Sequence, residues 1–158
     1  MSKKGVALSN IHGDQSALAK RDLLRWVAGD VRMAEIWGLE AMVDAWLQFE
    51  SALAQAQSEL DIIPSQACDA IVQACETVTL DLELLQRRTQ LVGYPILPLI
   101  EQLSLVSEDV AHFVHWGATT QDVMDTGLVL QIRAAHDYLL EQVDALGTQF
   151  ANLAVQHQ

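Results

Sequence analysis

The sequence predicts an all-α protein, and three features lead to that prediction. Apolar residues recur three and four positions apart over long stretches, which is the period of helices with one buried face. No alternating apolar and polar run typical of a strand interrupts these stretches. With 158 residues, 51% of them hydrophobic, the chain is also long enough to bury a sizeable single core.

The first helices are expected in an N-terminal helical domain over residues 21–112, which follows a polar tail at residues 1–20. The earliest clear helix ends near Pro64 and has an apolar seam made of Leu39, Met42, Trp46, Phe49, Leu53, Ala56 and Leu60. A shorter helix is expected to begin at or near Pro64, because proline is favoured at the start of a helix. Residues 81–91 form the next helix, which Gly93 ends. A further helix is expected in the segment YPILPLIEQLSLV, whose prolines are tolerated only in or just before a first helical turn.

A much longer helix is expected from about residue 120 to beyond residue 153. Its apolar stripe consists of Leu128, Ile132, Ala135, Leu139, Val143, Leu146, Phe150 and Leu153. At 1.5 Å per residue this helix would be about 50 Å long. Because such a stripe needs partner helices along its whole length, we expect that the chain oligomerises, that it is a fragment, or both. Residues 113–158 would then be a loop and the start of a truncated long helix.

Charge and composition restrict the partners. Lys and Arg total 9 against 21 Asp and Glu, a net charge of −12, so nucleic acid and anionic membranes are not expected to bind. The N-terminus lacks an apolar signal core and no apolar run could cross a membrane, which predicts a cytoplasmic protein. Cys68 and Cys75 would lie two helical turns apart, too far for a disulfide.

The segment HWGATTQDVMDT, from His115 to Thr126, is the strongest candidate for chemistry. Thr119 and Asp122 fit an acidic variant of the capping box, so free backbone N–H groups and a positive dipole end would meet there and favour a carboxylate or phosphate. Gly117 permits close backbone approach, and His115 can carry a proton. The alternative is that Thr119–Asp122 only cap a helix.

Other candidate residues carry weaker signals. His112 and His115 are three apart, but no further ligands accompany them, so no metal site is expected. No phosphate-binding glycine loop is present, so nucleotide-dependent chemistry is not expected. Tyr94 stands between Gly93 and Pro95, where its ring could pack in the core or its hydroxyl could reach a ligand.

The segment HWGATTQDVMDTGLVLQ resembles the first signature region of the fumarase/aspartase/adenylosuccinate lyase superfamily, most of all its 3-carboxy-cis,cis-muconate cycloisomerase branch. Two upstream segments, FESALAQAQSELDIIP and GYPILPLIEQL, resemble the elements that precede this region in the family. The resemblance runs from about Arg32 to His157. It covers only the first third of a typical member, up to the first long helix of a central helical bundle.

The resemblance implies a cofactor-free lyase or cycloisomerase that acts on a small polycarboxylate. A base would remove a proton α to a carboxylate, and a group on the β-carbon would leave. In this family pattern His115 would be a catalytic histidine that hydrogen-bonds substrate, Thr119 and Thr120 would bind a substrate carboxylate, and Gln121 would line the pocket. Tyr94 is a further candidate substrate-binding residue because of its hydroxyl. The resemblance also implies a homotetramer whose sites draw on several subunits. The loop that carries the base would lie beyond Gln158, so the chain alone would be inactive.

Two alternatives remain open from the sequence. One is an enzyme like adenylosuccinate lyase, although Val92–Ile96 lacks the histidine expected in that branch. The other is a non-catalytic helical module that self-associates through its long helix. Tyr94 stands where the cycloisomerases typically have asparagine, which leaves the substrate open.

Overall fold

The described part of the chain is helical and contains no strand, which confirms the all-α prediction. The computed structural model describes residues 29–106 and 108–157, so the predicted polar tail at residues 1–20 lies outside it. The helices, in chain order, are α3 (Val31–Ile36), α4 (Leu39–Glu59), α5 (Ser65–Thr77), α6 (Leu82–Val92), α7 (Ile96–Val106), the 3-10 helix η1 (Glu108–Phe113) and α8 (Thr120–Gln156).

Local capping signals set the helix boundaries close to where the sequence predicts them. Pro64 is the residue before the first turn of α5, where its missing N–H removes no intrahelical bond. The Asp81 carboxylate accepts a hydrogen bond from the backbone N–H of Leu84 and so caps α6. At the other end of α6, Gly93 takes a left-handed conformation with φ 93°, which glycine adopts without strain. The 3-10 helix η1 was not predicted.

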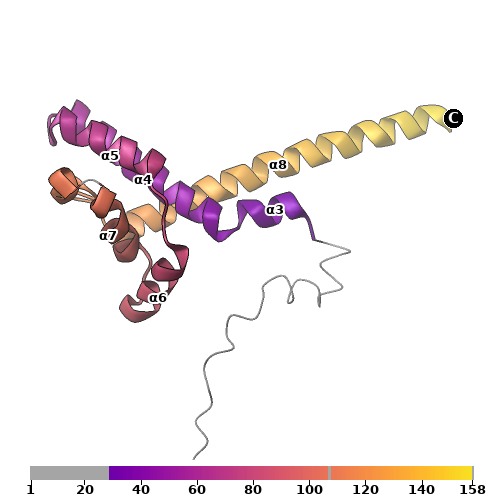
Figure 1. Ribbon diagram of the computed structural model, residues 1–158. Coiled ribbons are helices and arrows are strands. Elements are labelled where there is room, and N and C mark those ends of the chain that lie inside the picture. Colours follow the sequence, from indigo (N-terminus) through magenta and orange to yellow (C-terminus); the bar gives the residue numbers. More distant parts are fainter. Residues whose placement is uncertain (1–28, 107, 158) are drawn as a thin grey trace, which may run out of the picture.

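The core forms where α4, α5, α7 and the beginning of α8 pack together (Figure 1). Three residues of α7 on one face of that helix, Ile96, Leu99 and Leu103, are completely buried. Ile71 of α5 and Val123 of α8 are buried in the same cluster. Burial of these side chains supplies most of the stabilisation, at about 25 cal/mol for each Å² of apolar surface removed from water.

The buried face of α4 differs from the predicted seam. The predicted ends of the seam are exposed, Leu39 by 45% and Leu60 by 71%. Trp46 of the seam is buried as predicted, and Met42 and Phe49 are partly buried against the core. The other buried residues of α4 are Val43, Ala45, Leu47, Glu50, Ala54 and Gln57. The prediction is therefore only partly correct. The buried face is broader than the seam because α4 contacts both α5 and α8, and it includes Glu50 and Gln57, which bond to the loop before α8.

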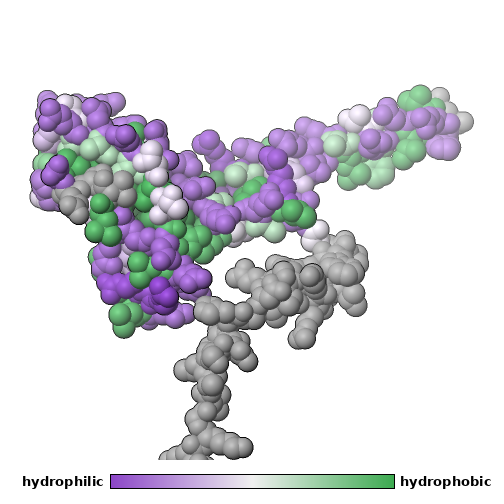
Figure 2. Space-filling view, viewed as in Figure 1, coloured by the Kyte–Doolittle hydropathy of each residue, from purple (hydrophilic) through white to green (hydrophobic). Residues whose placement is uncertain are grey.

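Helix α8 is the longest element, with 37 residues from Thr120 to Gln156, as predicted. Its buried residues, Val123, Gly127, Gln131 and Ala135, all lie in the first half. Residues 139–156, called here the outer half of α8, are exposed throughout. Figure 1 shows this half projecting beyond the other helices, and Figure 2 shows apolar and polar surface side by side along it. None of the described helices has the length and apolar character needed to span a membrane.

Candidate functional site

The loop between η1 and α8 has a backbone conformation that few residues adopt. His115 has φ 58° and Gly117 has φ 72°, both in the left-handed region. This conformation is uncommon for a residue with a side chain. Other contacts must therefore hold His115 in place, and they come from α4.

Glu50 of α4 holds His115 directly. The Nδ1 atom of His115 and the Oε1 atom of Glu50 lie 2.6 Å apart, across 65 positions of the sequence. The Glu50 side chain is 1% exposed and that of His115 is 17% exposed. Because Glu50 occupies Nδ1, the other ring nitrogen, Nε2, remains for a ligand.

Gln57 of α4 fixes the next residue of the loop. Its Nε2 atom donates a hydrogen bond of 2.6 Å to the backbone oxygen of Trp116. Since Glu50 and Gln57 are two helical turns apart, they lie on the same face of α4. Sequence reasoning missed both residues. The available signal was two polar side chains spaced with the apolar residues Val43 and Trp46 on one face of a helix.

The start of α8 is capped as predicted. The Thr119 hydroxyl accepts from the backbone N–H of Asp122, and the Asp122 carboxylate accepts from the Thr119 backbone N–H at 2.8 Å. The hydrogen bonds from the backbone N–H and the hydroxyl of Thr119 hold the pKa of Asp122 below its usual value. The predicted capping box is therefore confirmed, and the Thr119 hydroxyl is engaged in it.

The next two predicted site residues form the first turn of α8. Thr120 is half-buried, and Gln121 is exposed and donates a hydrogen bond to the Asp125 carboxylate. Backbone N–H groups in a first turn have no partner within the helix and point out from its positive end. The structure therefore brings His115, Thr119, Thr120 and Gln121 together at one helix start.

Tyr94 is not joined to this group. It lies between α6 and α7 and is 40% exposed. Among the described residues no hydrogen bond connects it to His115 or to the first turn of α8. Its predicted role in binding substrate stays a prediction.

Cations are scarce around the start of α8. Arg88 is bonded to Glu101 at 2.6 Å on the surface, and Arg133 lies further along α8 beside a groove shared with α4. Across residues 29–106 and 108–157, no ion pair joins an arginine to the loop or to the first turn of α8. His115 is therefore the basic side chain that the structure places at this point. The same described residues contain no group of three or more side chains arranged to hold a metal ion.

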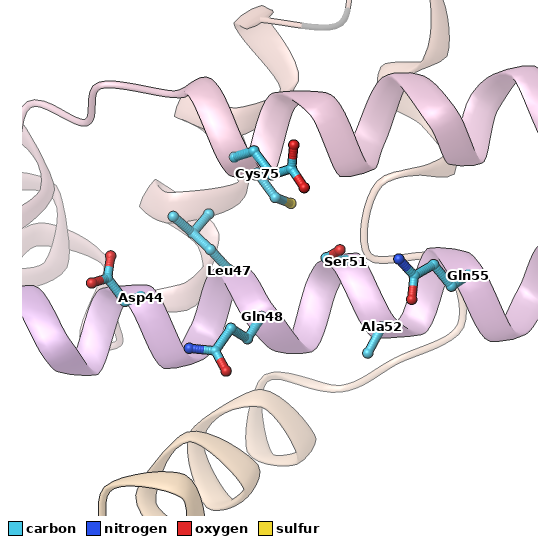
Figure 3. A pocket seen from close by; sticks show the side chains of 8 residues that line it. Asp44, Leu47, Gln48, Ser51, Ala52, Gln55 and Cys75 are labelled. Atoms are coloured by element: carbon cyan, nitrogen blue, oxygen red, sulfur yellow. The ribbon is translucent and has the colours of Figure 1, made fainter. Parts of the chain in front are cut away.

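A second candidate, a hollow of about 510 Å³ between α4 and α5, suits an anionic ligand less well (Figure 3). It is lined by Asp44, Leu47, Gln48, Ser51, Ala52, Gln55, Cys75 and Glu76. Two of these side chains are carboxylates and none is a cation, so the hollow repels a carboxylate ligand. Burial and the nearby charge of Glu50 raise the pKa of Cys75 to about 12, which leaves its thiol unreactive.

The fold is all-helical, and its longest helix, α8, starts at the loop that contains His115 and Thr119. Residues 27–158 match the model of a family described as lyase. The chain belongs to this family, and the resemblance found in the sequence is confirmed.

The chain is also similar to individual proteins and to a solved structure. The chain is 38% identical over 133 residues to trans-aconitate decarboxylase 1 of Mycosarcoma maydis, which covers 84% of this chain and 27% of that protein. It is 38% identical over 117 residues to 3-carboxy-cis,cis-muconate cycloisomerase of Acinetobacter baylyi, and this match covers 70% of the chain and 26% of that protein. The crystal structure of fumarate lyase from Mesorhizobium sp. BNC1 superimposes on the chain with a TM-score of 0.78 at 41% sequence identity. The superposition covers 81% of this chain and 30% of that protein. The chain thus spans less than a third of the length of these relatives.

Proposed function

We propose that the chain is the N-terminal part of a cofactor-free lyase or cycloisomerase that acts on a small polycarboxylate. The observation that carries the proposal is the meeting of His115 and the first turn of α8 in one place. A helix start with free N–H groups favours a carboxylate. The names of the relatives point to the same substrate class, since aconitate and carboxymuconate are both tricarboxylates.

The proposed reaction is an elimination of the type that the 3-carboxy-cis,cis-muconate cycloisomerases represent. A base takes the proton from the carbon α to a carboxylate, and the electrons of the broken C–H bond pass into that carboxylate. They return to form a C=C bond as the bond from the β-carbon to the leaving group breaks. In a cycloisomerase the leaving group is a carboxylate of the same molecule, so a lactone opens.

In this proposal the described residues bind and orient the substrate. His115 contacts the substrate as the catalytic histidine of this segment, and Thr119, Thr120 and Gln121 present a carboxylate seat at the start of α8. Tyr94 would contribute from the junction of α6 and α7. The base comes from a part of the enzyme other than residues 1–158, and so do the cations that the negatively charged chain lacks.

We further propose that the long helix serves a homo-oligomer, with a tetramer as the expected form. The exposed apolar residues of the outer half of α8, among them Leu139, Val143, Leu146 and Phe150, form a surface that needs a cover. In this arrangement residues 21–112 form one domain and residues 113–158 begin a central bundle.

The test is an assay of the complete gene product that contains this chain, with 3-carboxymuconate, trans-aconitate, adenylosuccinate and argininosuccinate. We expect turnover of a tricarboxylate. Thr120→Val should lower kcat/KM at least tenfold, by about 1.5 kcal/mol or more for a lost hydrogen bond to a charged group, while the melting temperature stays nearly unchanged.

Thr119→Ala is the matched variant for stability. The Thr119 hydroxyl caps α8, so its loss should lower the free energy of unfolding by about 1 kcal/mol, whereas Thr120→Val should leave it nearly unchanged. If none of the four substrates turns over and Thr120→Val changes nothing, the protein is a self-associating helical module and the enzyme proposal fails.

A further inference from the structure

We propose that Gln57 is a positioning residue that selects the orientation of the peptide between Trp116 and Gly117. This orientation decides whether the loop beside His115 offers a ligand a hydrogen-bond donor or an acceptor. The orienting role follows from the contacts of Gln57 alone. The identity of the ligand, a substrate carboxylate, rests on the proposed function.

The peptide before Gly117 has two orientations open to it. Trp116 stands between two left-handed residues, His115 with φ 58° and Gly117 with φ 72°. Glycine takes positive and negative φ about equally well. The peptide before it can therefore rotate to the opposite orientation, as the central peptide does between type I and type II turns. The local sequence does not decide between the two orientations.

A hydrogen bond from α4 makes the choice. The Nε2 atom of Gln57 donates to the Trp116 carbonyl oxygen at 2.6 Å, across 59 positions of the sequence. Since a carbonyl oxygen only accepts, the amide nitrogen of Gln57 must face it. Gln57 is 9% exposed and lies on the buried face of α4, so the packing around it fixes the donor. The bond forms in one orientation of the peptide and is lost in the other.

The other contacts of the loop do not make this choice. Among the described residues, one further hydrogen bond joins the loop to α4, between the His115 ring and Glu50, and it involves a side chain and not this peptide. The Trp116 N–H donates to the Phe113 carbonyl at 3.3 Å, but this N–H belongs to the preceding peptide. Gln57 is therefore the residue whose contact depends on how the peptide before Gly117 is turned.

The choice sets what the loop presents on the side away from Gln57. In a planar trans peptide the C=O and N–H bonds point in opposite directions. With the Trp116 carbonyl turned to Gln57, the Gly117 N–H points away from that side chain. Gly117 is exposed, and its N–H has no hydrogen-bond partner among the described residues. A rotated peptide would put the Trp116 oxygen in that place, where it would repel a carboxylate.

The Gly117 N–H stands close to the other candidate residues. Gly117 is two positions from His115 and two from Thr119, so its Cα lies within about 7 Å of theirs. A backbone donor that is already oriented stabilises negative charge without an additional cation, which suits a chain with a net charge of −12. Gln57 thus acts on a ligand through the loop.

Crystal structures of the complete gene product test the orienting role. In the unchanged protein we expect the Trp116 carbonyl to face Gln57. In Gln57→Met, which keeps the length of the side chain and removes the donor, the carbonyl should turn away from α4 or occupy both orientations. Gln55→Met is the matched control, because Gln55 is exposed on the same helix, and it should leave the carbonyl in place.

A Trp116 carbonyl that keeps its direction in Gln57→Met overturns the inference, and so does one that does not face Gln57 in the unchanged protein. If Gln57→Met does not fold, Gln57→Asn replaces it, with Gln55→Asn as its control. The asparagine amide is one carbon shorter and does not reach the carbonyl, so the same two outcomes decide the question.

The enzyme assay tests the consequence for a ligand. In the complete gene product, Gln57→Met should raise KM for a tricarboxylate about 10- to 100-fold, the worth of one hydrogen bond to a charged group, with a smaller change in kcat. A residue that only stabilised the fold would lower the melting temperature and leave the KM of the folded enzyme unchanged.

The two measurements separate this inference from the proposed function. If no substrate turns over while the Trp116 carbonyl turns in Gln57→Met, the proposed function fails and the orienting role of Gln57 stands. A carbonyl that turns while KM stays unchanged overturns the role of Gln57 in substrate binding.

Discussion

Gly127 of α8 lies directly against the indole ring of Trp46 of α4. A Cβ atom added at Gly127 would be 2.7 Å from Trp46 Cδ1 and 2.9 Å from Trp46 Nε1. Both residues are buried, and real Cβ atoms do not come this close to other side chains. The glycine therefore lets α4 and α8 approach each other near the loop that α4 holds.

Gly127→Ala is expected to destabilise the fold. Overpacking of a filled core costs about 1–3 kcal/mol, which exceeds the gain of about 1 kcal/mol from replacing glycine by alanine in a helix. Gly147→Ala is the matched control, because nothing lies within 4 Å of its added Cβ, and it should stabilise α8. Urea denaturation measures both. Equal effects of the two substitutions would contradict the packing of Gly127 on Trp46.

Local signals were sufficient to predict most of the helices. The boundaries of α5, α6 and α8 depend on Pro64, Gly93 and the Thr119–Asp122 capping box, and each of these acts within a few residues of its own position. The apolar face of α7 followed from spacing in the same way. The predicted start of α8 therefore agreed with the structure.

The support of the site could not be predicted, because it joins distant parts of the chain. Glu50 and His115 are 65 positions apart, and Gln57 and Trp116 are 59 apart. Periodicity identifies a buried face by its apolar residues, so two polar side chains on that face weaken the signal and shift the predicted seam of α4. Which loop would meet that face depends on the packing of α4 against α8, which local patterns do not specify.

The Asp122 carboxylate should make the stability of the chain depend on acid pH. Hydrogen bonds from the backbone N–H and then the hydroxyl of Thr119 lower the pKa of Asp122 from its ordinary value of 3.8. The unfolded chain therefore binds this proton more readily than the folded chain. The contribution of Asp122 is complete above about pH 4 and is lost as the pH falls through the lower, folded-state pKa.

Asp122→Asn tests this dependence by urea denaturation. The difference in unfolding midpoint between the unchanged chain and the variant should be present at about pH 7 and shrink below about pH 3. Asp144→Asn, an exposed carboxylate on the outer half of α8, is the control and should show no such change. A gap that widens on acidification would reverse the assigned direction of the Asp122 shift.

Cys75 should react far more slowly in the folded chain than in the unfolded chain. Burial, followed by the charge of Glu50, raises the pKa of Cys75 from 9.0 to about 12. Because the thiolate is the reactive form, its amount below pH 9 should fall roughly a thousandfold. Ellman's reagent at about pH 8, applied to a Cys68→Ala background with and without guanidinium, measures the two rates. Similar rates would show that Cys75 is not shielded between α4 and α5.

The outer half of α8 should cause the chain to associate. Its apolar residues are well exposed, for example Leu146 by 54% and Phe150 by 63%, and an uncovered stripe of this kind favours contact with another apolar surface. Leu146→Glu should weaken association in sedimentation experiments, since it places a charge within the stripe. Thr148→Glu adds the same charge about 200° around the helix and should leave association unchanged. A folded chain that sediments as a monomer at all concentrations, or equal effects of the two charges, would mean that this stripe does not drive association.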